Sequence, residues 1–196
     1  MPQKSAQFQS GGAIFSRNSQ LFLTDVTISA NWTHPGIGCG GGLYAKDSQL
    51  QVENTMLSSN VALIGAGAYI DGGSLSLETS EFEDNRSDWL AGGAFATGCA
   101  VEMVGVEFVG NRSSASVAAL ALSNCPSTIL DCLFEDNYAT GGNHGAVHCS
   151  DCDSLSFEAT VFRSNRTNDA SAALSCSASA LRVSGCQFIG NQSVEV

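Results

Sequence analysis

Short stretches in which apolar and polar residues alternate recur along the chain at a regular interval. The clearest copy reads LSLETSEFEDN from Leu75 to Asn85, and VEMVGVEFVGN from Val101 to Asn111 repeats its pattern 26 residues later. Alternation with a period of two is typical of β-strands, not of helices. The segments between the copies are short and rich in glycine. The pattern therefore predicts short strands joined by tight bends.

The same template extends over nearly the whole chain. An asparagine closes each copy at intervals of 25 to 29 residues, and an apolar residue stands three positions before it. The asparagines are Asn31, Asn60, Asn85, Asn111, Asn137, Asn165 and Asn191. The apolar residues are Ile28, Leu57, Phe82, Phe108, Phe134, Phe162 and Phe188.

A repeated unit this short cannot bury its apolar face alone, but stacked units can, with each strand pairing in parallel with its copy in the next turn. The sequence therefore predicts an all-β fold: one parallel β-helix, a solenoid of about seven rungs over residues 11–196, after a polar lead-in over residues 1–10. Stacking places the aromatic residues in an internal column. The recurring asparagine suits the left-handed position of a bend, and Gly92-Gly93 suggests a tight corner or a close backbone approach.

The combination of GGA(I/L/V) with FxxN resembles the repeat of the polymorphic outer membrane proteins of chlamydiae. The matching segments are Gly11–Ile14, Gly92–Phe95 and the sequences FEDN, FVGN, FRSN and FIGN, which together cover the length of the chain. The resemblance implies a right-handed β-helix and links the chain to the adhesive passenger regions of those proteins. Similar repeats also occur in extracellular proteins of algae and other protists.

Five of the repeated asparagines are followed by Ser or Thr two residues later, which is the acceptor motif for N-glycosylation. They are Asn31, Asn85, Asn111, Asn165 and Asn191, and none of the asparagines outside the repeat has this motif. A simple bend residue would explain the asparagine but not the hydroxyl. The motif therefore predicts N-linked glycans on these asparagines and an extracellular or cell-surface location.

The chain has eight cysteines, and some of them share a template position. Stacking would place Cys99 beside Cys125 and Cys149 beside Cys176 at about 5 Å, within the range of Cα separations that a disulfide allows. We therefore predict the disulfides Cys99–Cys125 and Cys149–Cys176. Buried free thiols are the alternative. The sequence leaves the pairing of the other cysteines open: Cys39, Cys132, Cys152 and Cys186.

Potential zinc ligands gather at His144, His148, Cys149 and Cys152. Because they form a single cluster without a second ligand pair, and an oxidising location favours disulfides, we expect no metal site and no cofactor. The formal net charge is −11, and the eight Lys and Arg residues suggest no basic stripe. This composition disfavours nucleic acid as a partner. No long apolar segment predicts membrane insertion.

Acidic residues are scattered over the rungs, so the sequence predicts no catalytic residues and not an enzyme. The favoured interpretation is a structural extracellular glycoprotein, a rod that builds a filament or surface appendage through self-association or as part of a longer chain. One alternative is an adhesin passenger domain that binds a cell surface. The other is a polysaccharide lyase or glycoside hydrolase of the β-helix type.

Overall fold

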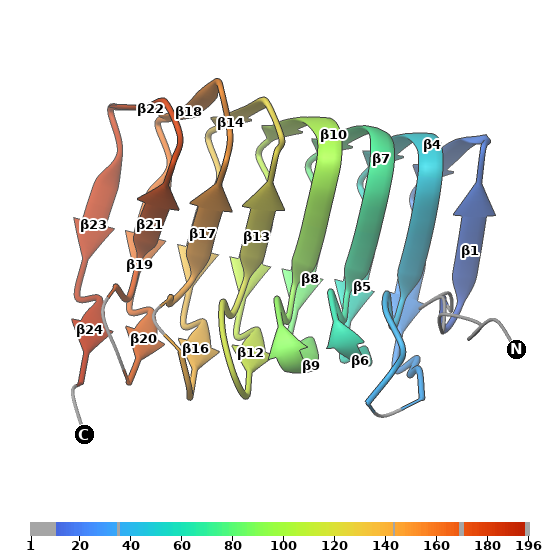
Figure 1. The fold of residues 1–196 in the computed structure, drawn as a ribbon, viewed down its shortest axis with the longest axis horizontal. Coiled ribbons are helices and arrows are strands. Elements are labelled where there is room, and N and C mark those ends of the chain that lie inside the picture. The colour runs from blue at the N-terminus through green and yellow to red at the C-terminus, as the bar shows by residue number, and fades with distance from the viewer. Residues whose placement is uncertain (1–10, 35, 143, 169–170, 195–196) are drawn as a thin grey trace, which may run out of the picture.

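The computed structural model describes residues 11–34, 36–142, 144–168 and 171–194, and these form one parallel β-helix (Figure 1). The predicted lead-in over residues 1–10 lies outside the described residues. Successive turns of the chain stack along the long axis, and every strand pairing is parallel, as in β7 with β10. Within the described residues there is no helix that could cross a membrane.

Each rung contributes strands to three sheets, which we call A, B and C. Sheet A has 11 strands: β1 (Ile14–Arg17), β2 (Gln20–Thr24), β4 (Leu43–Glu53), β7 (Ala68–Glu78), β10 (Ala94–Val104), β13 (Leu120–Ser123), β14 (Ser127–Leu130), β17 (Val147–Ser150), β18 (Leu155–Glu158), β21 (Leu174–Ser177) and β22 (Leu181–Ser184). Sheet B has 7: β3 (Thr27–Ser29), β5 (Met56–Ser58), β8 (Glu81–Glu83), β11 (Glu107–Val109), β15 (Leu133–Glu135), β19 (Val161–Arg163) and β23 (Gln187–Ile189). Sheet C has 6: β6 (Val61–Ile64), β9 (Arg86–Leu90), β12 (Arg112–Ser113), β16 (Tyr138–Ala139), β20 (Arg166–Thr167) and β24 (Gln192–Ser193).

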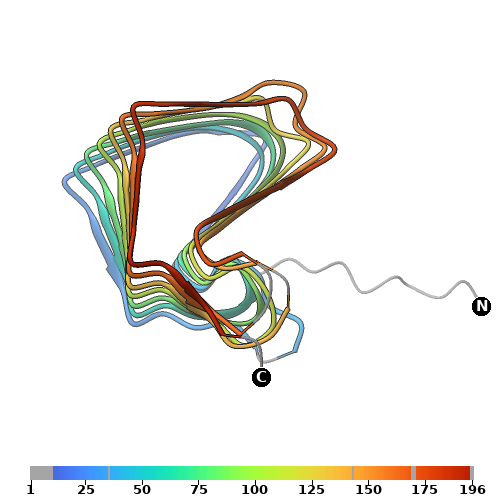
Figure 2. The same ribbon diagram turned by 90° about the vertical axis from the view of Figure 1, so that its left-hand side faces the viewer.

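Seen along its axis, the molecule is a stack of nearly superimposed outlines around one interior (Figure 2). The strands of sheet A bend in the middle. In the second to fourth rungs a single strand such as β4 passes through this bend, whereas the first rung and the later rungs have two strands there, such as β13 and β14. Sheets B and C close the outline. The predicted solenoid of parallel rungs is therefore confirmed.

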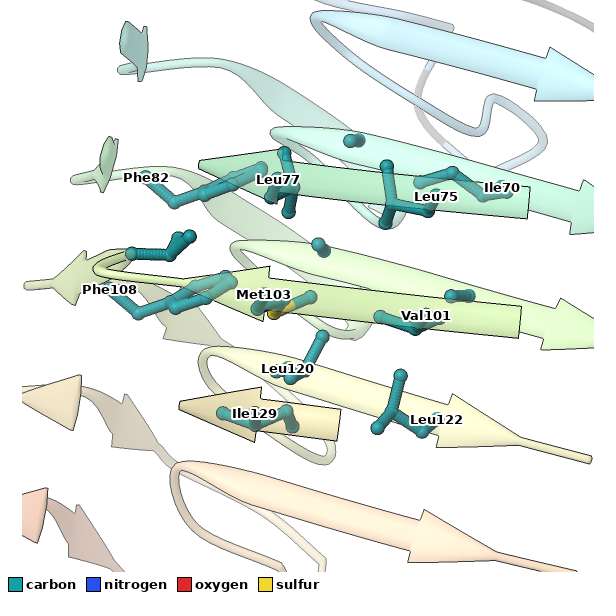
Figure 3. Close-up of a cluster of buried hydrophobic side chains, with 14 of the residues drawn as sticks. Ile70, Leu75, Leu77, Phe82, Val101, Met103, Phe108, Leu120, Leu122 and Ile129 are labelled. Atoms are coloured by element: carbon teal, nitrogen blue, oxygen red, sulfur yellow. The ribbon is translucent and has the colours of Figure 1, made fainter. Parts of the chain in front are cut away.

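The period-two alternation seen in the sequence separates the interior from the surface. Leu75 pairs in register with Val101, and Leu77 pairs with Met103; all four side chains are buried (Figure 3). The polar residue between them, Glu102, points outward and is exposed. Because each inward position repeats in the next rung, the apolar side chains form continuous columns along the core.

The aromatic residues three positions before the asparagines form one of these inward columns. The ring centroids of Phe82, Phe108, Phe134, Phe162 and Phe188 follow one another at 4.6, 5.0, 5.0 and 4.8 Å, and consecutive rings are nearly parallel. This spacing matches the distance between paired strands, about 4.8 Å. The predicted internal aromatic column is confirmed.

The left-handed residue of each bend is not the asparagine, as the sequence suggested, but the residue before it. Asp84 has a φ of 49°, Gly110 of 64° and Asp136 of 53°. Asp, Asn and Gly tolerate this conformation best, because their side chains are short or absent. Four of the seven bends have Asp or Gly at this position, and Ala30, Ser59 and Ser164 occupy the others. The left-handed residue thus stands one position earlier than expected, which turns the asparagine itself toward the interior.

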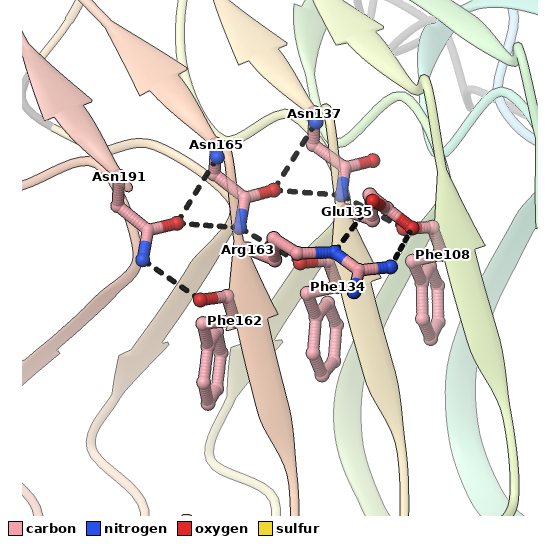
Figure 4. A network of polar contacts seen from close by, with 8 residues as sticks. All are labelled: Phe108, Phe134, Glu135, Asn137, Phe162, Arg163, Asn165 and Asn191. Atoms are coloured by element: carbon pink, nitrogen blue, oxygen red, sulfur yellow. Dashed lines mark hydrogen bonds and ion pairs between the residues drawn. The ribbon is translucent and has the colours of Figure 1, made fainter. Parts of the chain in front are cut away.

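The inward asparagines form a ladder of amide groups along the core (Figure 4). The Nδ2 atom of Asn137 donates to Oδ1 of Asn165 at 3.0 Å and to the carbonyl oxygen of Phe108 at 2.8 Å. Its backbone N–H also donates to Asn165 Oδ1, at 3.1 Å. The same bonds recur at Asn60, Asn85, Asn111 and Asn165. Each rung is therefore tied to its neighbours on both sides.

The predicted close approach of backbone at the glycine step is also confirmed. A Cβ atom on Gly93 would lie 2.5 Å from the carbonyl oxygen of Ala119 and 2.8 Å from the Phe108 ring. Real Cβ atoms do not approach so closely, so a side chain here would force the rungs apart. At Gly93 the glycine supplies space for the neighbouring rung, not a left-handed bend.

Candidate binding face

One outward column of sheet C carries arginine and aromatic side chains. Parallel registers align Arg86 with Arg112, Arg112 with Tyr138, and Tyr138 with Arg166. Toward the amino end, Val61 pairs with Arg86 and Trp32 pairs with Val61. We call Trp32, Val61, Arg86, Arg112, Tyr138 and Arg166 the arginine–aromatic column.

These side chains point outward because of the bend that turns the asparagine inward. Within each rung the chain alternates after the bend: the asparagine faces the core, the next residue faces solvent, and the third faces the core again. Trp32 is 69% exposed, the arginines are exposed, and Tyr138 is partly buried. Residues 25 to 29 positions apart in the sequence thus lie about one strand spacing apart, roughly 4.8 Å, on one face.

The charges in this column are not balanced by the protein itself. Arg86 and Arg112 are direct neighbours, and like charges directly opposite each other destabilise a strand pair. Within the described residues, Arg86, Arg112 and Arg166 make no salt bridge with a carboxylate. By contrast, Arg163 on sheet B donates to Glu135 at 2.6 Å. The column is therefore a place where a bound anion would relieve repulsion.

The aromatic members contribute further contacts to the same face. The guanidinium of Arg166 lies 5.8 Å from the centroid of the Tyr138 ring, within the range of a cation–π contact. Near the amino end of the column, Trp32, Val61 and Asp88 line a depression of about 370 Å³ together with smaller residues. Trp89, on β9, is also 55% exposed. Both tryptophans of the chain are thus exposed on or beside sheet C.

Carboxylates recur at outward positions of the other two sheets. On sheet A they include Glu53, Glu78, Glu102 and Glu158, and on sheet B Glu81, Glu83, Glu107 and Glu135. Burial, together with the neighbouring carboxylates, raises the pKa of Glu81 above its usual range. Three of the eight basic residues gather in the arginine–aromatic column, in a chain of formal net charge −11. The column is therefore a local basic feature on an acidic molecule.

The expectation that the chain has no basic stripe was thus wrong. Each arginine lies inside a predicted glycosylation motif, Asn-Arg-Ser or Asn-Arg-Thr, and that interpretation of the motif hides the alignment of the arginines. The signal was present in the sequence, because each arginine directly follows a repeated asparagine. Residues at one template position stack in the fold, so the three arginines had to form one stripe.

The predicted glycan sites also need correction. The side chains of Asn85, Asn111 and Asn165 are buried, and each Nδ2 atom donates both of its hydrogens within the ladder. A glycan would replace one of these hydrogens and would have to occupy the core. Glycosylation at these three positions is therefore incompatible with the fold.

The hydroxyls of the motif have a structural explanation as well. They belong to an inward column of small side chains: Thr33, Ala62, Ser87, Ser113, Ala139, Thr167 and Ser193. Small size is what these residues share, so Ser and Thr recur here without a glycan. Asn31 donates Nδ2 hydrogens to Ser29 and to Asn60 but is only partly buried, so glycosylation at Asn31 stays a prediction. At Asn191, which is partly buried and donates to Phe162, glycosylation stays a prediction.

Comparison with known proteins assigns the fold to a family. The family described as the right-handed β-helix region matches residues 12–196. The chain belongs to this family. Searches of curated proteins and of solved structures found no match. Family membership confirms the right-handed parallel β-helix, whereas the resemblance to chlamydial passenger repeats stays a prediction.

The β-helix brings the predicted cysteine pairs into register. The Sγ atoms of Cys99 and Cys125 lie 3.7 Å apart in neighbouring rungs, and Cys149 pairs with Cys176. The alignment of both pairs is therefore confirmed. All four residues are present as free thiols in the structure, and their oxidation to disulfides stays a prediction.

The residues with possible zinc-ligand character lie on opposite sides of β17. His148 points outward, whereas Cys149 and Cys152 are buried in the core. Ser175 Oγ lies 2.9 Å from Nδ1 of His148 and 3.0 Å from Nδ1 of His144, and the two imidazole rings stack. Within the described residues no group of three His, Cys, Asp or Glu side chains could hold a metal ion.

Proposed function

We propose that this right-handed β-helix is a binding rod that holds an extended acidic polysaccharide along the outer face of sheet C. The supporting observation is the register of Arg86, Arg112 and Arg166, three arginines on one face without a carboxylate partner in the described residues. This role corresponds to a structural or adhesive protein at a cell surface or in an extracellular matrix. It continues the adhesive alternative that the sequence suggested.

An acidic polysaccharide fits the chemistry of the arginine–aromatic column. The planar guanidinium group binds carboxylate or sulfate with two parallel hydrogen bonds. The exposed ring of Trp32 and the partly buried ring of Tyr138 offer apolar faces against which sugar rings stack. The column repeats at the strand spacing, about 4.8 Å, so an extended polymer with one charge in each sugar unit meets several binding groups in sequence.

Rigidity also supports this proposal. The arginines stand on strands that are fixed by the asparagine ladder and the stacked phenylalanines. A preorganised surface loses little conformational entropy when it binds a polymer. The net charge of −11 repels any polyanion at long range, so binding has to come from the local arginines. A nucleic acid duplex, with one charge per about 1.7 Å of its axis, is repelled more strongly than a polymer with one charge in each sugar unit, which makes it the poorer candidate.

The experiment measures binding of polygalacturonate to the purified protein by calorimetry, with neutral dextran as the reference polymer. The double variant Arg86→Glu/Arg112→Glu should weaken binding of polygalacturonate by at least about tenfold, since each hydrogen bond to a charged group contributes roughly 1.5–3 kcal/mol. The matched control is Arg17→Glu/Arg182→Glu, which changes the net charge equally but on sheet A. Equal losses in both variants, or equal binding of dextran, would exclude a specific site on sheet C.

The same experiment separates binding from catalysis. If the protein is a polysaccharide lyase or glycoside hydrolase, the recovered polymer becomes shorter, and new reducing ends or unsaturated ends accumulate with time. A binding rod returns the polymer at its original length. Size-exclusion analysis of polygalacturonate before and after incubation therefore distinguishes the two functions.

End-to-end self-association is a second candidate, favoured by the exposed core of the last rung. Val183 and Phe188 are 43% and 50% exposed, whereas Phe157 and Phe162, aligned with them one rung earlier, are fully buried. A further rung of the same template, from a second copy or from a longer chain, would bury them. Sedimentation should show concentration-dependent assembly that Phe188→Asp abolishes and Trp89→Asp leaves intact; a single monomeric species at all concentrations would exclude it.

A further inference from the structure

Three cysteines from successive rungs occupy one inward corner of sheet A. Thr97, Ser123 and Ser150 pair with one another in neighbouring rungs. Cys99, Cys125 and Cys152 each follow two residues later, directly after a residue in the left-handed conformation. All three are buried. We call them the cysteine column. Stacked rungs place neighbouring members about 4.8 Å apart, within the range of Cα separations of a disulfide.

In other rungs, serine occupies the position of these cysteines and makes a hydrogen bond within the bend. Ser48 donates from Oγ to the carbonyl oxygen of Lys46 at 2.8 Å, and Ser179 donates to Ser177 at 2.8 Å. The thiols of Cys125 and Cys152 donate in the same way to the carbonyl two residues earlier, each at 3.3 Å. Serine therefore makes the hydrogen bond that this bend needs. The fold does not require cysteine at this position, although three consecutive rungs have it.

Cys125 is the central member and is close to both neighbours. Its Sγ atom lies 3.7 Å from Sγ of Cys99. The hydrogen bond from the Cys99 thiol lowers the pKa of Cys125 below its usual range, which favours the reactive thiolate. On the other side, Ser123 pairs with Ser150, so Cys152 occupies the aligned position in the next rung. Burial raises the pKa of the Cys152 thiol above its usual range.

We propose that Cys125 forms a disulfide with either neighbour, and that this single bond moves between Cys99–Cys125 and Cys125–Cys152 by thiol–disulfide exchange. The first bond forms when the Cys99 and Cys125 thiols each lose a proton and together give two electrons to a small disulfide such as oxidised glutathione. The Cys152 thiolate then attacks Sγ of Cys125. The Cys99–Cys125 bond breaks, and Cys99 leaves as a thiolate that takes up the proton Cys152 released.

Because the three cysteines share one central partner, the column holds one disulfide and one free thiol at a time. The cross-link therefore joins the rung of β13 to one of its two neighbours, either the rung of β10 or the rung of β17. This inference extends the predicted pair Cys99–Cys125 to Cys152, whose partner the sequence left open. It does not depend on the proposed polysaccharide site, which lies on the outer face of another sheet.

The test refolds the reduced full chain in a mixture of oxidised and reduced glutathione, alkylates the remaining thiols, and maps the disulfide-linked peptides. Digestion at arginine and at aspartate places the three cysteines on separate peptides, through cleavage at Arg112, Asp131, Asp136 and Asp151. The wild-type chain should yield both linked pairs, Cys99 with Cys125 and Cys125 with Cys152. Each pair should account for a measurable share of the total Cys125.

Serine variants decide the assignment, since serine already occupies this position in other rungs. Cys99→Ser should shift all oxidised Cys125 to Cys152, and Cys152→Ser should shift it to Cys99. The control Cys132→Ser removes a buried thiol from a different corner and should leave both pairs. The proposal is overturned if Cys125 never links to Cys152 in Cys99→Ser, or if Cys125 remains a thiol in every variant.

Discussion

Asn111 shows how one side chain joins neighbouring rungs in a dry interior. Its Oδ1 atom accepts two hydrogen bonds from Asn85, one from the backbone N–H and one from Nδ2, both at 3.1 Å. Its own Nδ2 donates to Phe82 and to Asn137. Buried polar groups are costly unless they are paired. Aspartate lacks the donors and glutamine is longer, so the ladder specifies asparagine.

Asn111→Ala should lower the free energy of unfolding by roughly 3–5 kcal/mol, because several buried groups lose partners at about 1–3 kcal/mol each. The groups left unpaired are the N–H and Nδ2 of Asn85 and the carbonyl oxygen of Phe82. Denaturant unfolding followed by circular dichroism measures the change. Arg112→Ala, the outward neighbour, is the control and should stay within about 0.5 kcal/mol of the parent. Similar values for both variants would contradict the ladder.

His148 should make stability depend on pH. Burial, and then the neighbouring His144, lowers the pKa of His148 to about 4 in the folded protein. In the unfolded chain the pKa is about 6.5. The unfolded state therefore binds more protons as the pH falls from about 6.5 to 4, and the free energy of unfolding decreases over that window.

Denaturant unfolding at pH 7 and pH 4.5 checks this effect by comparison of variants. His148→Gln should lose less stability between the two pH values than the parent, since it lacks the titrating group. His34→Gln, which changes an exposed histidine, should behave as the parent does. An unchanged pH dependence in His148→Gln would show that other groups determine it.

At the scale of the strands, stability comes from columns that run through several elements. Phe134 on β15 lies between Phe108 on β11 and Phe162 on β19, with ring centroids 5.0 Å away on both sides. Each short strand pairs through only three residues, as Leu133–Glu135 does with Glu107–Val109. Such a strand is too short to be stable alone, so the stacked side chains must hold it in place.

Phe134→Ala should lower the free energy of unfolding by roughly 3–5 kcal/mol, because it opens a cavity inside a continuous column. Phe134→Leu is the matched control. Leu57 already occupies this column in another rung, in register with Phe82. The leucine variant should therefore lose much less. Chemical denaturation compares the two, and an alanine variant as stable as the parent would mean that the column contributes little.

At the scale of the whole molecule, charge is distributed unevenly around the rod. Carboxylates recur on the outer faces of sheets A and B, whereas the arginine–aromatic column gives sheet C a basic stripe. Net charge determines the long-range field around a protein, whereas a local stripe of one sign can attract a ligand of the other sign. Under the proposed function, the arrangement of the charges and not the net charge therefore decides the partner.

Binding of polygalacturonate should weaken as salt increases, because exposed charges are screened within about 8 Å at physiological ionic strength. Titrations from low salt to physiological salt should show a steady loss of affinity. The Arg86→Glu/Arg112→Glu variant should show a much flatter dependence, since its main charged contacts are gone. Salt-independent binding by the parent would indicate that the aromatic residues, not the arginines, carry the affinity.

Much of the architecture was determined by the sequence itself. A repeat of 25 to 29 residues with period-two alternation predicts stacked parallel strands, because every unit must bury its apolar face against a copy of itself. The inward Leu, Val and Phe columns follow directly from this register. The alignment of Cys99 with Cys125 follows as well, since equal template positions must stack.

The tertiary structure decided the direction of the side chains at the bends. A left-handed residue directly before each asparagine rotates the chain so that the asparagine and the small residue two positions later face the core. No pattern of hydrophobicity reveals this rotation, because asparagine and serine are polar whether they are buried or exposed. The rotation converts predicted glycan sites into a buried ladder. It also turns Arg86, Arg112 and Arg166 outward into one stripe, which exists only because the rungs stack one strand spacing apart.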